Sequence, residues 1–308
     1  MLRLCTLFLA SSLLFPVLAQ AQSALGTVRA FSVVGDVTLR NDTSGAEVPL
    51  TPGREFTEGF TVITGGGSSV TLVQSNGASI NLEENTSLSV NEFLQDPYNT
   101  TQGTYTKLQE DPSTSSTRIK LNYGEITGNV KRLRPTSSYN VDLPTGSAGI
   151  RGTSYRARVT FTSDPATGET IVNIAFANAD GEIVFNFNDV ITDIPPQNEV
   201  TIEGTFEEEF DPENDELPEG TFEFSDPEEI ENDEVEDIIT ETLRKLGQSE
   251  EEQEQQETPP GNEDEDEGQP EGEDDEDDAV EIDDNPDNNP EGDEDDFFDE
   301  LSPSNNDT

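Results

Sequence analysis

Short stretches of alternating apolar and polar residues fill the first two thirds of the chain. In residues 139–143, and again in 155–161, every second position is apolar. A period of two is typical of β-strands that bury one face. Further stretches with strand character occur at 26–34, 37–40, 60–63, 70–75, 80–82, 88–90, 118–121, 172–176, 183–187 and 200–202. The pattern predicts an all-β domain over residues 26–203, either an antiparallel sandwich or a short β-solenoid, and the spacing does not decide between them.

Glycine-containing dipeptides separate several of these stretches. Gly35-Asp36, Asn76-Gly77 and Asp180-Gly181 each lie between two apolar stretches. Such pairs favour the tight turns that join antiparallel neighbours. Each of the three is therefore predicted to be a turn between paired strands.

A distinctive break separates the strands predicted at 139–143 and 155–161. Pro144 and Gly146 end the first strand, and the break continues through Gly149, Ile150, Arg151, Gly152 and Thr153. Two glycines that flank a single Ile-Arg pair predict a sharp bend, which needs positive φ or a close approach of two backbones.

Arg151, at the centre of this bend, has two interpretations. It binds a partner, or it ties the bend to a carboxylate such as Asp142 or Glu125. A guanidinium fixed in place is well suited to bidentate pairing with a carboxylate. We favour the structural interpretation.

Two segments depart from the strand pattern. Residues 93–116 are rich in Thr, Ser, Asn, Gln and Pro, and we interpret them as an insertion that forms an exposed flap. Residues 227–246 carry an apolar stripe near helical spacing, with Pro227 in the first turn and Gly247 after the last. They predict an amphipathic helix that docks on its own domain or on a partner, and we favour its own domain.

The charge of the chain is concentrated at its C-terminal end. The whole chain has a formal net charge of −53, and residues 204–308 contain 47 acidic and only 2 basic residues. Such a segment cannot bury enough apolar surface to offset its chain entropy. We therefore predict an acidic linker over 204–247, which contains the helix, and a disordered acidic tail over 248–308.

The first 21 residues have the pattern of a secretory signal peptide. Arg3 precedes an apolar run, and Ala19-Gln20-Ala21 matches a cleavage site that would leave Gln22 as the first mature residue. No other apolar run is long enough to cross a bilayer. The mature chain is expected to be exported, to the periplasm or beyond, without a membrane-spanning segment.

The residue inventory excludes several kinds of chemistry. The chain has no His, and its only Cys is Cys5, within the predicted signal peptide. Serine–histidine and cysteine–histidine catalysis are therefore excluded, as are sites that bind zinc through Cys or His. We expect no enzyme activity and no cofactor, beyond weak and unspecific binding of divalent cations by the tail carboxylates.

Basic residues gather in one segment of this acidic chain. Between residues 118 and 158 only two carboxylates accompany Arg118, Lys120, Lys131, Arg132, Arg134, Arg151, Arg156 and Arg158. By alternation Arg118, Lys120, Arg156 and Arg158 point away from the apolar face, and we predict that they bind a partner or the acidic tail. A nucleic acid is not expected as a partner of an exported anionic protein. The alternative is a solvated face without a partner.

Several short motifs occur in a recognisable order. They are Thr64-Gly65 with Ser68 or Ser69, Asn76-Gly77, Asn85-Thr86-Ser87-Leu88, the segment 121–126, and Ile150-Arg151-Gly152-Thr153-Ser154-Tyr155. In this order they resemble the FecR domain, a module of the bacterial envelope, over about residues 26–161. The family usually has Thr-Pro before the last motif, whereas this chain has Pro144-Thr145.

The resemblance implies a non-enzymatic interaction or sensing module of the cell envelope. In the family such domains receive signals from outer-membrane receptors and pass them to a sigma-factor system. Because this chain has no predicted membrane helix after the signal peptide, we do not transfer the relay role. The expected partner is an envelope protein or a cell-wall glycan, and the sequence does not decide which. The alternative is a surface protein that binds carbohydrate or cell wall, which exposed aromatic platforms would favour.

Overall fold

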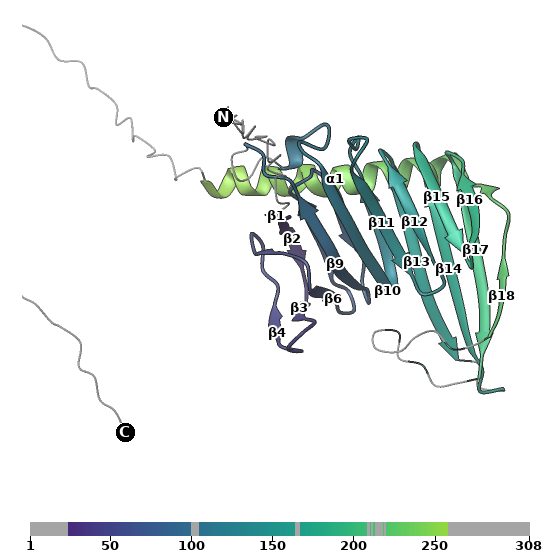
Figure 1. Ribbon diagram of the computed structural model, residues 1–308. Helices are drawn as coiled ribbons and strands as arrows, with labels where there is room; N and C mark the ends of the chain where they lie inside the picture. Colours follow the sequence, from purple (N-terminus) through teal and green to yellow (C-terminus); the bar gives the residue numbers. More distant parts are fainter. Residues whose placement is uncertain are drawn as a thin grey trace, which may run out of the picture. The chain divides into compact units, whose positions relative to one another are not determined.

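Strand β10 (Ser115–Asn129) joins the two layers of the fold (Figure 1). The structure is a computed structural model that describes residues 24–99, 105–163, 167–207, 210, 212, 218 and 220–257, all within one structural unit. The predicted signal peptide, and the predicted tail beyond residue 257, lie outside the described residues. β10 pairs with strands of one layer through residues 115–123 and with strands of the other through 124–129.

The first layer, called layer A, contains the first part of β10. Neighbouring strands follow one another in the order β4, β3, β6, β9, β10, β11, β12, β15 and β16, and β1 pairs with the far end of β9. Their bounds are β1 Ala24–Leu25, β3 Val37–Asn41, β4 Glu47–Pro49, β6 Phe60–Thr64, β9 Ser87–Gln95, β11 Ser138–Leu143, β12 Gly146–Arg151, β15 Glu182–Phe187 and β16 Val190–Ile194.

The second layer, called layer B, contains the last part of β10. Its order is β5, β2, β7, β8, β10, β13, β14 and β17, and both β18 and β19 pair with β17. Their bounds are β2 Val28–Val34, β5 Glu55–Phe56, β7 Ser69–Gln74, β8 Ser79–Leu82, β13 Ser154–Ser163, β14 Thr170–Asn178, β17 Asn198–Phe206, β18 Thr221–Phe224 and β19 Glu228–Glu229.

The two layers pack face to face around one apolar core. The apolar side chains predicted from alternation point into the core. For example, Tyr155, Ala157 and Val159 of β13 are buried. The ring of Phe185 in layer A lies 5.9 Å from that of Phe176 in layer B, centroid to centroid. All ladders are antiparallel except that between β10 and β11. The all-β prediction is confirmed, and the strands form an antiparallel sandwich, not a solenoid.

Two of the three predicted hairpins are wrong. Asn76-Gly77 does join the paired strands β7 and β8, and Gly77 has φ +88°. Gly35-Asp36 joins β2 to β3, and Asp180-Gly181 joins β14 to β15, but in each case the two strands lie in different layers. The dipeptides correctly mark where the chain turns. Which strand becomes the neighbour is decided by burial across the whole sandwich, which a dipeptide does not encode.

The bend predicted around Arg151 is shorter than expected. Strand β12 continues through Arg151, so Gly149 and Ile150 are strand residues paired with β15. Only Gly152 has positive φ, at +61°, and there the chain leaves layer A for layer B. The prediction was wrong for Gly149 because β15, which pairs with this stretch, comes later in the sequence and extends the strand.

The predicted insertion at 93–116 is also shorter, and its described part is not a flap. Its first residue, Phe93, is completely buried in β9, and Ser115 already belongs to β10. A short 3-10 helix, Tyr105–Lys107, follows residues outside the description. Tyr105 is buried against Phe31 and Val73. The ring of Tyr105 therefore packs the segment onto the domain, although the surrounding sequence is polar.

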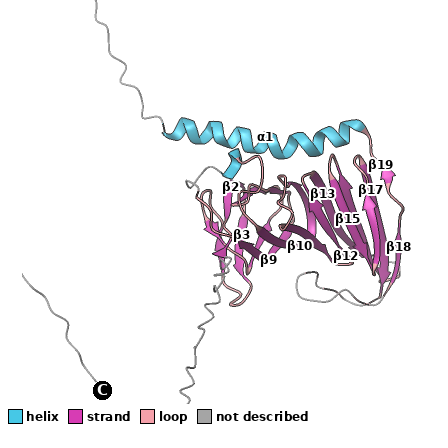
Figure 2. Cartoon of the chain, turned by 45° about the horizontal axis from the view of Figure 1, so that its top comes forward, coloured by secondary structure: helices cyan, strands magenta, loops and turns pink. Residues whose placement is uncertain are grey.

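Helix α1 (Asn232–Glu257) lies across the outer face of layer B (Figure 2). Val235 and Ile238 pack on Ala177 and Ala179 at the end of β14, and Leu246 is buried further along the helix. The preferred interpretation, docking of the helix on its own domain, agrees with these contacts.

The bounds predicted for the helix and the linker are wrong. Glu228 and Glu229 pair with β17, so the helix starts at Asn232 instead of 227. Gly247 does not end it, because one glycine costs only about 1 kcal/mol in a helix interior and strong helix formers follow. The segment after 203 is no mere linker, since β17 runs on to residue 206 and β18 adds to the sheet.

Candidate functional site

Side chains of the sequence motifs hold the places where the chain passes between layers. Ser68 accepts a hydrogen bond through Oγ from the backbone N of Asp36, at 2.8 Å, beside the β2–β3 crossing. At the β12–β13 crossing, Thr153 donates through Oγ1 to Asp180 Oδ1, also at 2.8 Å. A short polar side chain thus satisfies buried groups where the strand ladder is interrupted.

The chain also passes from one layer to the other inside β10 itself. Gly124 has φ +94°, and a Cβ added to it would lie 2.5 Å from the backbone Cα of Thr86. Thr86 Oγ1 accepts from the backbone N of Glu125 at 3.0 Å. A shift of register after Leu121 accompanies this turn, so the core side chains are at odd positions before it and at even positions after it. Only glycine fits this position, and Thr86 holds the turned backbone.

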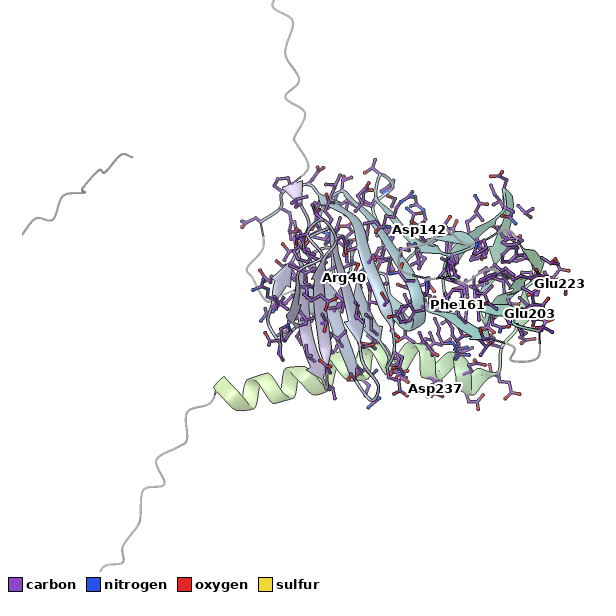
Figure 3. All side chains as sticks on the ribbon, turned by 90° about the horizontal axis from the view of Figure 1, so that it is seen from below. Arg40, Asp142, Phe161, Glu203, Glu223 and Asp237 are labelled. Atoms are coloured by element: carbon purple, nitrogen blue, oxygen red, sulfur yellow. The ribbon has the colours of Figure 1, made fainter. Side chains whose placement is uncertain are left out.

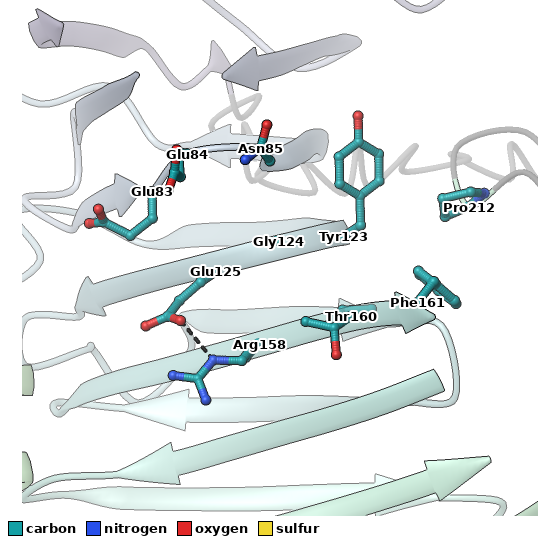
Figure 4. Close-up of a pocket in the computed structure, with 11 residues that line it drawn as sticks. Glu83, Glu84, Asn85, Tyr123, Gly124, Glu125, Arg158, Thr160, Phe161 and Pro212 are labelled. Atoms are coloured by element: carbon teal, nitrogen blue, oxygen red, sulfur yellow. Dashed lines mark hydrogen bonds and ion pairs between the residues drawn. The ribbon is translucent and has the colours of Figure 1, made fainter. Parts of the chain in front are cut away.

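A cleft of about 700 Å³ opens beside the turn in β10 (Figure 4). Residues of β10 and β13 and of the turn between β8 and β9 line it, together with Pro212. Its lining includes Glu83, Glu84, Asn85, Tyr123, Gly124, Glu125, Arg158, Thr160 and Phe161. The cleft therefore combines two aromatic rings with three carboxylates and one guanidinium.

The charged groups of the cleft are already engaged. Arg158 Nε donates to Glu125 Oε2 at 2.7 Å, the contact drawn in Figure 4. Lys245, on α1, donates through Nζ to Glu83 Oε1. Glu84 accepts from the backbone N of Gly67 at 2.6 Å. These contacts fix the carboxylates in place. The rings of Tyr123 and Phe161 form part of the apolar wall.

The described walls of the cleft lack two features of common catalytic sites. Within the described residues, no group of three Asp, Glu, Cys or His side chains is placed to hold a metal ion. Among the described residues that line the cleft, Arg158 is the only cation, and it pairs with Glu125; the sequence contains no histidine. A catalytic nucleophile needs a base within hydrogen-bond reach, and the described lining residues form no such hydrogen-bonded pair.

The four basic residues predicted as one face lie on two opposite faces. Arg118 and Lys120 are on the outer face of layer A, where Arg118 lies 3.6 Å from Asp142. Arg156 and Arg158 are on the outer face of layer B. Figure 3 shows Asp142 on the side of the molecule away from α1. The turn at Gly124 separates the pairs, and sequence alternation could not reveal it.

Carboxylates of the same domain accompany most of these basic groups. Arg156 contacts Glu199 at 3.2 Å and also Glu234 of α1. Burial alone would lower the pKa of Arg156, but hydrogen bonds from its guanidinium to Glu234 and Glu199 raise that pKa above its ordinary value. Burial raises the pKa of Asp142, and Arg118 and Lys120 partly oppose the rise. The outer faces of layers A and B therefore carry less unpaired positive charge than the sequence suggested.

The tie predicted between Arg151 and Asp142 or Glu125 is wrong. Asp142 pairs with Arg118, and Glu125 pairs with Arg158. Arg151 instead lies exposed at the end of β12, opposite Glu182 in the ladder with β15. It forms no ion pair among the described residues. The misassignment arose because the strands that pair could not be read from the sequence.

Sequence reasoning did not identify the cleft. Of its aromatic residues, Tyr123 belongs to the motif at 121–126 and Phe161 ends the strand predicted at 155–161, and neither had been connected with a cleft. The available signal was Gly124, because a glycine within a strand often marks a bulge or a bend.

Among the described residues, no helix combines the length and the hydropathy that a membrane crossing requires.

The described residues define a two-layer β domain with a cleft beside the turn in β10. Residues 60–173 match the family model described as FecR protein, which confirms the resemblance to the FecR domain over this segment. The matched segment includes the crossing residues Ser68, Thr86 and Thr153.

Comparisons beyond the family model are more distant. Two crystal structures of a candidate anti-sigma factor from Parabacteroides distasonis, at 1.65 Å and 2.50 Å resolution, are each 12% identical to this chain, with a TM-score of 0.33 over 54% of it. The chain spans 58% of the length of that protein. None of the curated proteins matches the chain.

Proposed function

We propose that this protein is an exported, non-enzymatic FecR-like module that recognises a protein partner of the cell envelope. The observation that carries the proposal is the cleft beside the turn in β10, within the FecR domain. Clefts that bind ligands are typically apolar with a few fixed polar groups. Tyr123 and Phe161 supply apolar surface here, and the Glu125–Arg158 pair supplies a fixed donor and acceptor.

Binding of carbohydrate remains the alternative function, and the described surface offers it less support. Sugar-binding faces use exposed aromatic rings. The large apolar side chains exposed in the described part of the chain are all aliphatic, namely Leu25, Val34, Val48, Val190, Ile191 and Leu243. A protein partner with an apolar side chain beside a charged one matches the cleft better.

Site-specific crosslinking from the cleft tests the proposal. A photoreactive residue placed at Thr160, which lines the cleft and is exposed, should capture an envelope protein when the full chain is expressed in its native host. The same residue at Ser44, exposed in the loop between β3 and β4, is the matched control. Identical products from both positions, or none from Thr160, would count against recognition through the cleft.

A further inference from the structure

A second cavity lies beside the corner at Gly152, apart from the cleft. Its volume is about 490 Å³, and its walls come from the end of β10, the residues that follow it, and the β12–β13 crossing. Three basic side chains line it, those of Lys131, Arg132 and Arg151. In a chain with 15 basic and 68 acidic residues, this gathering of cations in one cavity needs an explanation.

The three cations have no carboxylate partner in the described structure. None of them forms an ion pair there, in contrast to Arg156, Arg158 and Lys245. The contrast is informative because the domain is rich in carboxylates, and three arginines elsewhere in its described part, Arg118, Arg156 and Arg158, do pair with them.

The one carboxylate in the cavity lining, that of Asp180, already accepts two hydrogen bonds through one of its oxygens. Asp180 Oδ1 accepts from Thr153 Oγ1 and from the backbone N of Ser154, both at 2.8 Å. Two other carboxylates are close in the fold: Glu182 lies opposite Arg151 in the ladder, and Glu110 forms a backbone bridge with Arg132. Neither forms an ion pair with these cations. The cavity lining itself therefore has three positive groups against one carboxylate.

The backbone around the cations is firmly held. Val130 N donates to Thr153 O at 2.9 Å, and Asp111 N donates to Arg132 O at 3.0 Å. Arg132 and Gly152 are close, since a Cβ on Gly152 would lie 3.6 Å from the Cα of Arg132. The backbones at Arg132 and Arg151 are thus held on facing segments, which favours a preformed site.

Lys131 adds an energetic argument. Its ammonium is half-buried, and burial lowers its pKa below the ordinary value. A cation that loses hydration without gaining a partner is destabilised. A bound anion would provide the missing compensation.

We propose that this cavity is a binding site for a multiply charged oxyanion. Guanidinium forks pair with carboxylate and phosphate oxygens in bidentate geometry, and an ammonium contributes a compact charge. Three cations call for at least two anionic groups on the ligand. Neighbouring carboxylates of an acidic peptide and the two phosphates of a diphosphate share this chemistry. The site is separate from the cleft, so the proposal does not depend on the function proposed for the cleft.

Titration calorimetry of the full chain with two probes tests this site. Inorganic pyrophosphate and an aspartate hexapeptide represent the two sources, and the tighter binder identifies the source. We expect Arg151→Gln and Lys131→Gln each to weaken that probe about tenfold or more. Arg118→Gln is the matched control, because Arg118 is an exposed arginine on layer A, and it should change the affinity by less than about twofold.

The outcomes that would overturn the proposal are equally specific. Neither probe binding at millimolar concentration would exclude the site. Equal weakening by Arg118→Gln would indicate only unspecific attraction to positive charge. Urea unfolding of each variant checks that it folds, and amide NMR shifts on probe addition should concentrate at residues 129–133 and 151–153. Shifts spread over the whole domain would also reject the proposal.

Discussion

At the residue scale, glycine and threonine at the layer crossings carry the strictest requirements. Gly124 combines positive φ with contact against the backbone of Thr86, whereas Gly45 has φ +66° and open space where a Cβ would lie. The two glycines therefore separate the cost of backbone conformation from the cost of crowding.

We predict that Gly124→Ala destabilises the domain by more than about 3 kcal/mol, because strain at positive φ adds to overlap with the Thr86 backbone. Gly45→Ala should cost only the strain, about 1 kcal/mol. Urea unfolding followed by circular dichroism measures both values. Equal midpoints for the two variants would show that Thr86 does not restrict the turn.

Tyr98 provides a pH-dependent test at the same scale. Its hydroxyl donates to the backbone O of Ser75, and burial, with help from Tyr105 and Asp111, raises its pKa to about 12. A raised pKa means that the fold favours the neutral phenol. Its contribution to stability is complete below pH 10, the ordinary value, and is lost as the pH rises to about 12.

Tyr98→Phe should accordingly cost about 1 kcal/mol at pH 8, the value of one hydrogen bond. The difference between the two proteins should shrink above pH 10 and vanish near pH 12. Urea midpoints at pH 8, 10 and 11.5 follow this trend. A constant difference over that range would mean that the phenol proton does not contribute.

At the element scale, α1 is held by few apolar side chains. Ile238 is 1% exposed against Ala177 and Ala179, whereas Leu243 on the same helix is 46% exposed. We expect Ile238→Ala to destabilise the protein by about 2 kcal/mol and Leu243→Ala by less than about 0.5. Thermal unfolding separates the two. Similar losses would mean that the helix does not dock through this face.

The sequence predicted elements better than it predicted their neighbours. The stripe of Tyr155, Ala157 and Val159 identified β13 and its buried face, because alternation depends only on local residues. The partners of Arg158 and Arg118 were not predictable, since they depend on strands far away in the sequence. The turn at Gly124 places these arginines in different layers, and no local pattern encodes that outcome. The cleft was missed for the same reason.

At the scale of the whole molecule, export is the prediction with the simplest test. The signal peptide predicted over 1–21 should be removed during secretion. N-terminal sequencing of the protein recovered from its native host should start at Gln22. An Ala19→Leu, Ala21→Leu variant, which lacks small residues at the cleavage site, should retain the leader. Recovery of exported protein that still begins at Met1 would refute this prediction.

The position of β10 between the layers also constrains how the chain folds. Among the described residues, no strand before β10 pairs with a strand after it, so the strand ladders of the two halves are joined only through β10. During synthesis or export, β8 and β9 emerge first and present bare edges until β10 follows. Unpaired edges promote association between chains. A nascent chain that stalls before residue 115 is therefore the form most exposed to aggregation and to capture by chaperones.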